Sequence, residues 1–328
     1  MARIGIGLIG VGRHGLRYAH HIRQDVPDLE LVAIARRNRK EAQRQAEEFG
    51  CRAYDDYRDL LAAPEVDAVA LVVPPALHLE MIEEAARRGR PVLLEKPAAI
   101  TVDEGRRMVQ AVKNAGIPVM VAQTLRYNGV VQTLLREREK IGRIHAVRVS
   151  QRFEPSPVGW VDDLSQAGGG ILLHTGVHGF DLIRLFSGLE ADGVYCRMEK
   201  VGDVELENNF SAMIELGRGE VLATVSGCRA TESRTGAMDL AGEKGQLLGD
   251  HVLGTAHLVR ERTATALPVP EDVPTVRATL EDFARALLAE REMPIPLEEG
   301  LRASALALAC HRSALEGVRV RVDRMWGD

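Results

Sequence analysis

Residues 7–15 are GLIGVGRHG, which places Gly10, Gly12 and Gly15 in the spacing G-x-G-x-x-G. An apolar stretch typical of a β-strand precedes them, and a helical stretch with a charged face follows. In a strand–turn–helix unit, such glycines turn the chain tightly, let a pyrophosphate approach the backbone, and pack helix against strand. The helix N-terminus then presents free amides to phosphates. We therefore expect a dinucleotide site formed by Gly10, Val11, Gly12, Arg13, His14 and Gly15; the alternative is a structural turn.

The alternation of short apolar runs and helical stretches continues to about residue 123. The apolar runs include LELVAIA, AVALVV, PVLLEK and PVMVAQ, several of them apolar almost throughout, as in strands covered on both faces. Gly50, Gly89 and Gly116 end three of the helical stretches, which is the usual place for glycine. This pattern predicts an α/β Rossmann domain, a doubly wound parallel sheet, over residues 1–123.

The pattern changes in residues 124–328. One helical segment covers about 171–187, several strand-like runs follow it in succession, and two helices end the chain. Strands that follow strands predict an α+β domain with a mostly antiparallel sheet. A chain of 328 residues is also longer than one hydrophobic core usually serves. We therefore expect two domains.

Composition narrows the function class. The net charge of −5 argues against a nucleic-acid binder. No apolar run reaches the roughly 18 to 20 residues of a membrane span, and no leader-like segment opens the chain. Four scattered cysteines form no C-x-x-C pair, as expected of buried thiols in a reducing compartment. A cytoplasmic protein is the expectation.

The end of the second strand bears on which dinucleotide is bound. An acidic residue at this position usually accepts hydrogen bonds from the ribose hydroxyls of NAD. Arg36 occupies it here, with Arg37 beside it. A guanidinium pairs with a 2′-phosphate instead, so that NADP is favoured and NAD remains an alternative. The arginines could also be solvated, or Arg36 could stack on adenine.

Two further strand ends carry candidates near the cofactor, since ligands bind at this edge of a doubly wound sheet. Val73, Pro74 and His78 follow one strand, and Glu95 and Lys96 end another. His78 could equally be a packing or capping residue, and most lysines are solvated. Beside a bound nicotinamide, Lys96 would orient a substrate hydroxyl and favour its alkoxide.

In order and spacing, GLIGVGRHG, VLLEKPAA, AQTLRYN and GGGILLHTGVHGFDL resemble the glucose–fructose oxidoreductase / inositol dehydrogenase family (Gfo/Idh/MocA). The resemblance covers nearly the whole chain. It implies a Rossmann domain followed by a domain with a large open sheet that often mediates oligomers. It also implies hydride transfer between NAD(P) and a hydroxyl or carbonyl carbon, commonly of a sugar or cyclitol.

The resemblance also assigns residues. Lys96 matches the lysine near nicotinamide and substrate, and His178 matches the histidine usually taken as the acid/base. Arg126 and Tyr127 match an Arg-aromatic pair at the domain junction, and we expect them to contact substrate. Many members carry aspartate at position 174, where this chain has His174; smaller departures are Val73 and Gly129.

His174 and His178 allow three interpretations. Their spacing suits two zinc ligands, but Thr175 stands where HExxH has its glutamate, Asp181 lies too far along, and no third ligand is evident. Packing is the second alternative, and for Asp181 the favoured one. We favour acid/base chemistry without a metal, because imidazole exchanges protons near neutrality. His178 would be the main acid/base and His174 would bind substrate or relay the proton, with the reverse assignment as the alternative. The two would titrate as a coupled pair.

The sequence thus predicts a metal-independent, NADP-preferring homo-oligomeric oxidoreductase acting on a sugar, cyclitol or related polyol, with Trp160 stacking on the substrate or filling the core. The alternatives are a reductase of a non-sugar carbonyl or imine, and a silent NAD(P)-binding sensor.

Overall fold

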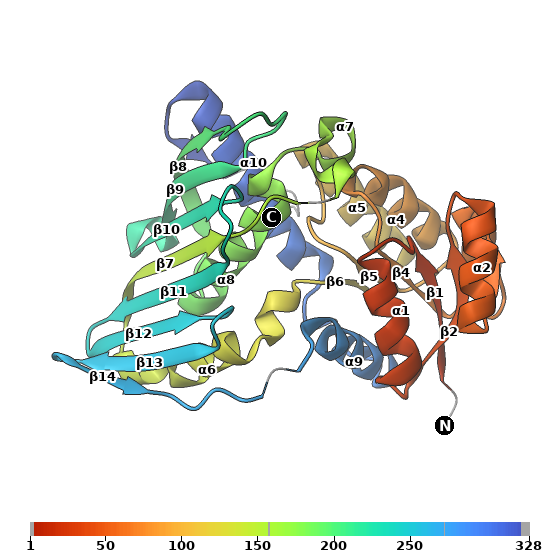
Figure 1. Ribbon diagram of the computed structural model, residues 1–328, viewed down its shortest axis with the longest axis horizontal. Coiled ribbons are helices and arrows are strands. Elements are labelled where there is room, and N and C mark those ends of the chain that lie inside the picture. Colours follow the sequence, from red (N-terminus) through yellow and green to blue (C-terminus); the bar gives the residue numbers. More distant parts are fainter. Residues whose placement is uncertain (1–2, 157, 272, 323–328) are drawn as a thin grey trace.

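The structure, a computed structural model, describes residues 3–156, 158–271 and 273–322, so that the outer ends of the two expected domains lie outside the described residues. Figure 1 shows two sheets lying side by side, each with its own set of helices.

The first sheet has six parallel strands in the order β3-β2-β1-β4-β5-β6, which confirms the doubly wound Rossmann fold. Its strands are β1 (Ile4–Ile9), β2 (Leu29–Ala35), β3 (Arg52–Tyr54), β4 (Ala68–Leu71), β5 (Val92–Leu94) and β6 (Val119–Val121). Between them lie α1 (Gly15–Gln24), α2 (Arg39–Phe49), α3 (Tyr57–Ala62), α4 (His78–Arg87) and α5 (Val102–Ala115). The strand order reverses between β1 and β4, which is where such sheets bind ligands.

The glycine loop between β1 and α1 has the geometry that its spacing predicts. Gly10 has φ of 94°, and a Cβ there would lie 2.2 Å from the Val72 carbonyl oxygen. A Cβ on Gly15 would lie 2.0 Å from the Gly10 oxygen. Gly12 differs, because a Cβ there would meet no described atom within 4 Å. Gly10 and Gly15 are therefore required by the fold, whereas Gly12 leaves open space beside the backbone.

The second sheet has nine strands in the order β14-β13-β12-β11-β7-β10-β9-β8-β15, and all its pairs except β7–β10 are antiparallel. This confirms the mostly antiparallel α+β expectation. Its strands are β7 (Ile144–Arg152), β8 (Ala191–Glu199), β9 (Asn209–Leu216), β10 (Val221–Cys228), β11 (Thr235–Gly242), β12 (Gly245–Asp250), β13 (Thr255–Arg260), β14 (Thr263–Ala266) and β15 (Val320–Arg321).

Helices cover one face of this sheet, as Figure 1 shows for α6, α8 and α10. The helices of this half are α6 (Gly129–Glu137), α7 (Leu164–Ala167), α8 (Val177–Ser187), α9 (Thr275–Leu288) and α10 (Leu297–Glu316). Residues of β9 and β10 alternate between buried and exposed positions, so one face packs on the helices. On the opposite face Tyr195, Met213 and Leu222 are exposed.

The first core also takes in residues from the C-terminal part of the chain. Val276, Leu280 and Phe283 of α9, and Leu301 and Ala305 of α10, are buried in the same cluster as the first sheet. The division expected at residue 123 stays a prediction. Beyond it, α9 and the start of α10 pack their apolar residues against α1 and β6 of the first half.

Candidate active site

The candidate site lies at the carboxyl ends of β4, β5 and β6. Leu71 pairs with Leu94, and Leu94 with Val121, so the residues after these strands lie along one edge of the sheet. Glu95 and Lys96 continue directly from β5.

Glu95 is buried and joins the glycine loop to β5. Its Oε1 accepts from Tyr18 Oη at 2.6 Å and lies 2.7 Å from His14 Nε2, while Oε2 accepts from the Lys96 amide at 3.1 Å. Burial works to raise the pKa of this carboxyl, but the hydrogen bond and charge of His14, the charge of Lys96 and the hydrogen bond from Tyr18 together lower it to about 2. Glu95 is thus a buried carboxylate that fixes the start of α1 relative to Lys96.

Lys96 connects the two domains. Its Nζ donates to the backbone oxygen of His174 at 3.0 Å. Burial lowers the pKa of the ammonium group, and Glu95 opposes that shift. The strand-end lysine is therefore anchored to the second domain rather than solvated.

His174 lies in a widened turn that the sequence did not predict. Residues Leu172–Gly176 form a π-helix, and α8 continues from Val177. A π-turn inside a helix often marks a functional site. At Gly179 a Cβ would lie 2.6 Å from Val225 Cγ1, so only glycine lets this helix approach the sheet so closely. The expected helix over about 171–187 is correct in extent, but its first turn is not α-helical.

Both histidines are held neutral. Burial, then the Lys96 charge, lowers the pKa of His178 to about 3. Burial, Lys96, Arg229 and His178 lower the pKa of His174 well below its ordinary value. Desolvation contributes most to both shifts, and coupled titration of the two histidines stays a prediction.

One ring nitrogen of His178 is available to a ligand. Nδ1 is buried and has no hydrogen-bond partner among the described residues, whereas the residue as a whole is half-buried. Nδ1 is therefore closed to a ligand, so that Nε2 is the ring nitrogen that a ligand could reach.

Trp160 lies beside His174. Their rings meet edge to face with centroids 6.1 Å apart. Trp160 is half-buried in a 3-10 turn, Gly159–Asp162. The expected substrate-stacking residue is thus adjacent to the histidine pair.

Arg126 and Tyr127, expected to contact substrate, are engaged elsewhere. Arg126 donates from Nε to Asp181 Oδ2 at 2.7 Å and from Nη2 to Glu299 Oε2 at 2.8 Å. Tyr127 Oη donates to Asp282 Oδ2 of α9 at 2.8 Å. Their donors thus tie α8, α9 and α10 to the domain junction. We infer a positioning role, with Asp181 as the structural partner that the sequence favoured.

His78 is fully buried and lies between two loops. Nδ1 lies 3.1 Å from the Pro97 carbonyl oxygen and Nε2 lies 3.2 Å from the Val73 carbonyl oxygen. Burial lowers the pKa of His78. This is the packing alternative: His78 fixes the segments that follow β4 and β5, including Val73 and Pro74.

The arginines after β2 differ in their surroundings. Arg36 Nη1 donates to the Val11 oxygen at 3.4 Å and to Gln45 Oε1 at 3.1 Å, and lies 3.6 Å from Glu41. Arg37 is exposed, as is Arg13 in the glycine loop. Arg36 therefore lies under the loop, with Arg37 at the surface.

Among the described residues, one group of side chains has the spacing of a metal site: His20 and His21 on α1, with Asp25 directly after the helix. His21 Nδ1 and Asp25 Oδ2 are already 2.6 Å apart. His174 and His178 do not belong to such a group.

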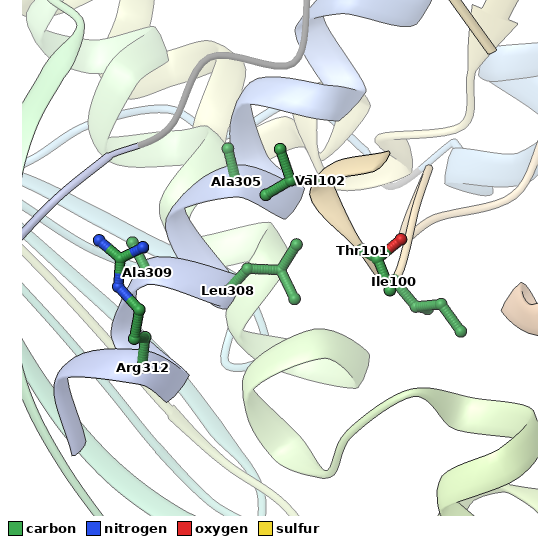
Figure 2. Close-up of a pocket in the computed structure, with 7 residues that line it drawn as sticks. All are labelled: Ile100, Thr101, Val102, Ala305, Leu308, Ala309 and Arg312. Carbon is green, nitrogen blue, oxygen red and sulfur yellow. The ribbon is translucent and has the colours of Figure 1, made fainter. Parts of the chain in front are cut away.

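A small groove of about 250 Å³ lies between α10 and the segment after Lys96 (Figure 2). Leu308 of α10 points toward Ile100 and Thr101 in this view. No residue of the candidate site lines it, so we assign it no part in the chemistry.

Three residues near the site were missed from the sequence. Tyr18 lies one turn after His14, which could have shown that it faces Glu95. Gln123 lies two residues after β6, at the same sheet edge as Lys96, and its buried side-chain amide has no partner among the described residues. Arg229 follows β10, and no sequence motif marked it as a residue near the site.

Family models match both halves of the chain. Residues 4–123 match an oxidoreductase family with an NAD-binding Rossmann fold, and residues 131–248 match the GFO/IDH/MocA C-terminal domain. The chain belongs to the Gfo/Idh/MocA oxidoreductase family.

Its relatives in this family are distant but nearly full-length. An uncharacterized oxidoreductase, YrbE, of Bacillus subtilis is 26% identical over 98% of this chain and 97% of that protein. A dTDP-3,4-didehydro-2,6-dideoxy-alpha-D-glucose 3-reductase of Actinomadura kijaniata is 27% identical over 95% and 96%. Levoglucosan dehydrogenase, solved with NADH and L-sorbose, superposes with a TM-score of 0.89 at 23% identity, covering 99% of this chain and 100% of that one. The family acts as oxidoreductases, and this chain is such an enzyme.

The depressed pKa of His178 predicts acid sensitivity. An unfolded histidine gains a proton as pH falls through about 6.5, whereas folded His178 stays neutral to about 3. Its stabilising effect is therefore complete above pH 6.5 and is lost as pH falls toward 3. Between pH 7.5 and 5.5 the free energy of unfolding should fall by about 1 kcal/mol through this residue. Urea unfolding at the two values should show a smaller fall for His178→Gln, whereas His145→Gln, at an exposed position of β7, should keep the wild-type fall. An unchanged slope in His178→Gln would contradict the depressed pKa.

Proposed function

We propose that this protein transfers a hydride between a nicotinamide dinucleotide, preferably NADP, and a hydroxyl or carbonyl carbon of a sugar, cyclitol or related small polyol. The observation that carries the proposal is the meeting of the two domains at Lys96. Its Nζ holds the backbone of His174, in the turn that leads into His178. Lys96 and His178, whose side chains could bind and deprotonate a substrate hydroxyl, are thereby brought to the ligand-binding edge of the Rossmann sheet.

The glycine loop fits the cofactor. Space is open at Gly12, and the N-terminus of α1 has neither a side-chain cap nor an acidic residue in its first turn. The Leu16 and Arg17 amides already donate to the Gly12 and His14 oxygens, so the loop amides before them would hold the anion, as at other helix N-termini that bind pyrophosphate. The bound nicotinamide would accept or supply the hydride.

Lys96 and His178 would have different roles at the substrate oxygen, one stabilising its charge and the other taking its proton. The Lys96 ammonium, fixed by the His174 oxygen, stabilises negative charge as a hydroxyl loses its proton. His178, neutral near pH 7, accepts that proton at Nε2. His174 would then bind a second substrate oxygen or pass the proton on.

The charge state also favours one direction. Because the pKa of His178 is about 3, the free enzyme near pH 7 holds no imidazolium that could protonate a substrate carbonyl. We therefore propose that the free enzyme is prepared for oxidation of a hydroxyl, and that kcat/KM for oxidation lacks a histidine-controlled fall between pH 6 and 8.

Substrate class is supported by the surroundings and by the relatives. The Trp160 ring beside His174 offers an apolar face to the C–H face of a sugar or cyclitol ring. Relatives include a myo-inositol 2-dehydrogenase of Thermotoga maritima, 27% identical over 76% of both chains.

The open face of the second sheet supports a homo-oligomer. Tyr195 and Met213 are opposite each other on β8 and β9, with Leu222 close by on β10, and all three are exposed. Exposed apolar side chains grouped in this way mark interaction surfaces. We propose that two copies of the chain pair through this face.

A cytoplasmic location is supported by the cysteines. Cys51, Cys196, Cys228 and Cys310 are all free thiols, as expected in a reducing compartment. Among the described residues, no helix combines the length and apolarity needed to cross a bilayer.

The activity is tested by following nicotinamide absorbance with panels of sugars, inositols and small carbonyls, each with both dinucleotides. We expect turnover of a polyol, and a loss in kcat of about 10²-fold or more in Lys96→Met and His178→Gln. His174→Ala should lose less, and Lys113→Met, exposed on α5, should lose nothing. Binding without turnover would favour the sensor. Turnover of non-sugar carbonyls alone would favour the other reductase, and wild-type rates in His178→Gln would refute the acid/base role.

Cofactor preference is tested by comparing NADPH and NADH affinities. We expect NADPH to bind more tightly, because Arg36 and Arg37 would pair with the 2′-phosphate. The Arg36→Asp change should reduce the ratio of affinities about tenfold or more, since a charge-assisted hydrogen bond is lost. Arg44→Ser, on the outer surface of α2, is the matched control. Equal affinities in the wild-type protein would overturn the preference.

Oligomerisation is tested by sedimentation velocity at micromolar concentration. The wild-type chain should sediment as a dimer or larger, and Met213→Arg should shift it to monomer by placing a charge in the apolar face. A monomeric wild-type protein, or an unchanged Met213→Arg oligomer, would refute this interface.

A further inference from the structure

A buried arginine is paired with the turn that carries Trp160. Arg229 directly follows β10 and is 4% exposed. Its Nη2 donates to Asp162 Oδ1 at 2.5 Å, the ion pair that this guanidinium makes within the described chain. Its Nη1 is enclosed without a partner among the described residues. The Asp162 carboxylate is thus what balances a charge removed from water.

Asp162 and Trp160 belong to one compact turn. The 3-10 turn Gly159–Asp162 holds both, and the amide of Asp163 donates to the Trp160 oxygen at 3.2 Å. Val161, between them, is 1% exposed. An interaction that holds Asp162 in place therefore also holds the turn that carries the Trp160 indole, two residues earlier.

The backbone of Arg229 is anchored beside the histidine turn. Its amide donates to the Asn208 oxygen at 2.7 Å, and the neighbouring Glu207 oxygen accepts from the Ile171 amide at 2.9 Å. Ile171 immediately precedes the π-turn of His174. Arg229 therefore links two parts of the cleft: its backbone is fixed next to the His174 segment, and its side chain holds the Trp160 turn.

We propose that Arg229 is a positioning residue of the substrate site, and that its ion pair with Asp162 holds the Trp160 ring edge-on against His174. The inference rests on the proposed function, since it takes the Trp160 ring to be the surface on which the apolar face of a ring-shaped substrate packs. The position of the Trp160 ring is set by the ion pair that the buried Arg229 makes with Asp162. Specificity for ring-shaped polyols therefore depends on Arg229, which does not itself touch the substrate.

The same loop offers a matched control. Arg234 donates to Glu154 at 2.8 Å, but these side chains are 54% and 42% exposed. The two pairs differ in the arginine: Arg229 is 4% exposed although its partner Asp162 is 38% exposed. An exposed ion pair contributes little, whereas removal of Asp162 leaves the buried Arg229 guanidinium without its counter-charge. Only the pair with the buried arginine should control the position of Trp160.

The test uses Trp160 as its own reporter. The chain has two tryptophans, so a Trp326→Phe background leaves Trp160 alone. In that background Arg229→Met and Asp162→Asn should shift the emission to longer wavelength and increase acrylamide quenching, because the indole leaves His174. Arg229→Lys should restore part of the effect, and Arg234→Met should change nothing.

Kinetics on any polyol that the enzyme turns over give a second readout. Arg229→Met should raise KM about two- to tenfold with kcat little changed, since the lost contact is a ring-packing one of about 0.5–1.5 kcal/mol. Lys96 and His178 remain in place. NADPH affinity should also stay at the wild-type value, which shows that the protein is folded.

The outcomes separate the two proposals. Absence of turnover on every compound refutes the proposed function, while the fluorescence measurements need no substrate. Unchanged emission and quenching in Asp162→Asn, with NADPH binding intact, overturns the anchoring role. Equal effects in Arg229→Met and Arg234→Met overturn it as well, because the loop would then respond to any lost charge.

Discussion

The hydrogen bond from Lys96 to the backbone oxygen of His174 is the contact on which the candidate site depends. It is made by the end of β5 on one side and by the first turn of the α8 segment on the other. Glu95 fixes the position of the segment that carries Lys96, because its contacts with His14 and Tyr18 tie the end of β5 to the start of α1. The glycine loop, the lysine and the histidine pair are therefore connected through a continuous chain of hydrogen bonds, and each element's position limits the others.

Burial decides the charges within this arrangement. Two imidazoles, an ammonium and a carboxylate lie close together in a poorly hydrated region, and charges there are costly unless they are paired. Glu95 remains ionised because donors surround it, whereas burial, and after it the charge of Lys96, lowers the pKa of both histidines. Position 174 shows the effect most directly. An aspartate there would have added a negative charge beside His178, whereas His174 adds a neutral ring and leaves Lys96 as the dominant local charge.

Much of this could be predicted from the sequence, and the limits have physical causes. The first sheet and the strand-end position of Lys96 were predicted from the glycine spacing, the apolar runs and the segment VLLEKPAA. Local geometry determines these features, so a local sequence pattern is enough to find them. The succession of strands predicted the class of the second sheet, but not its order, which depends on pairings between distant segments. Arg126 and His78 were expected near ligands, yet carboxylates and carbonyls contributed by other elements engage them. The π-turn and Arg229 could not be found, since no local pattern encodes a tertiary contact.

The return of α9 and the start of α10 to the first core has a consequence for biosynthesis. A ribosome releases the six parallel strands long before Leu280 and Phe283 are made, so the nascent Rossmann half has an apolar surface with nothing to cover it. That half cannot complete its core until almost the whole chain has emerged. Strands β7 to β14 of the second sheet are also made before α9 and α10, and residues of α10 are buried in the second core as well as in the first. Both cores therefore depend on helices that are synthesised last.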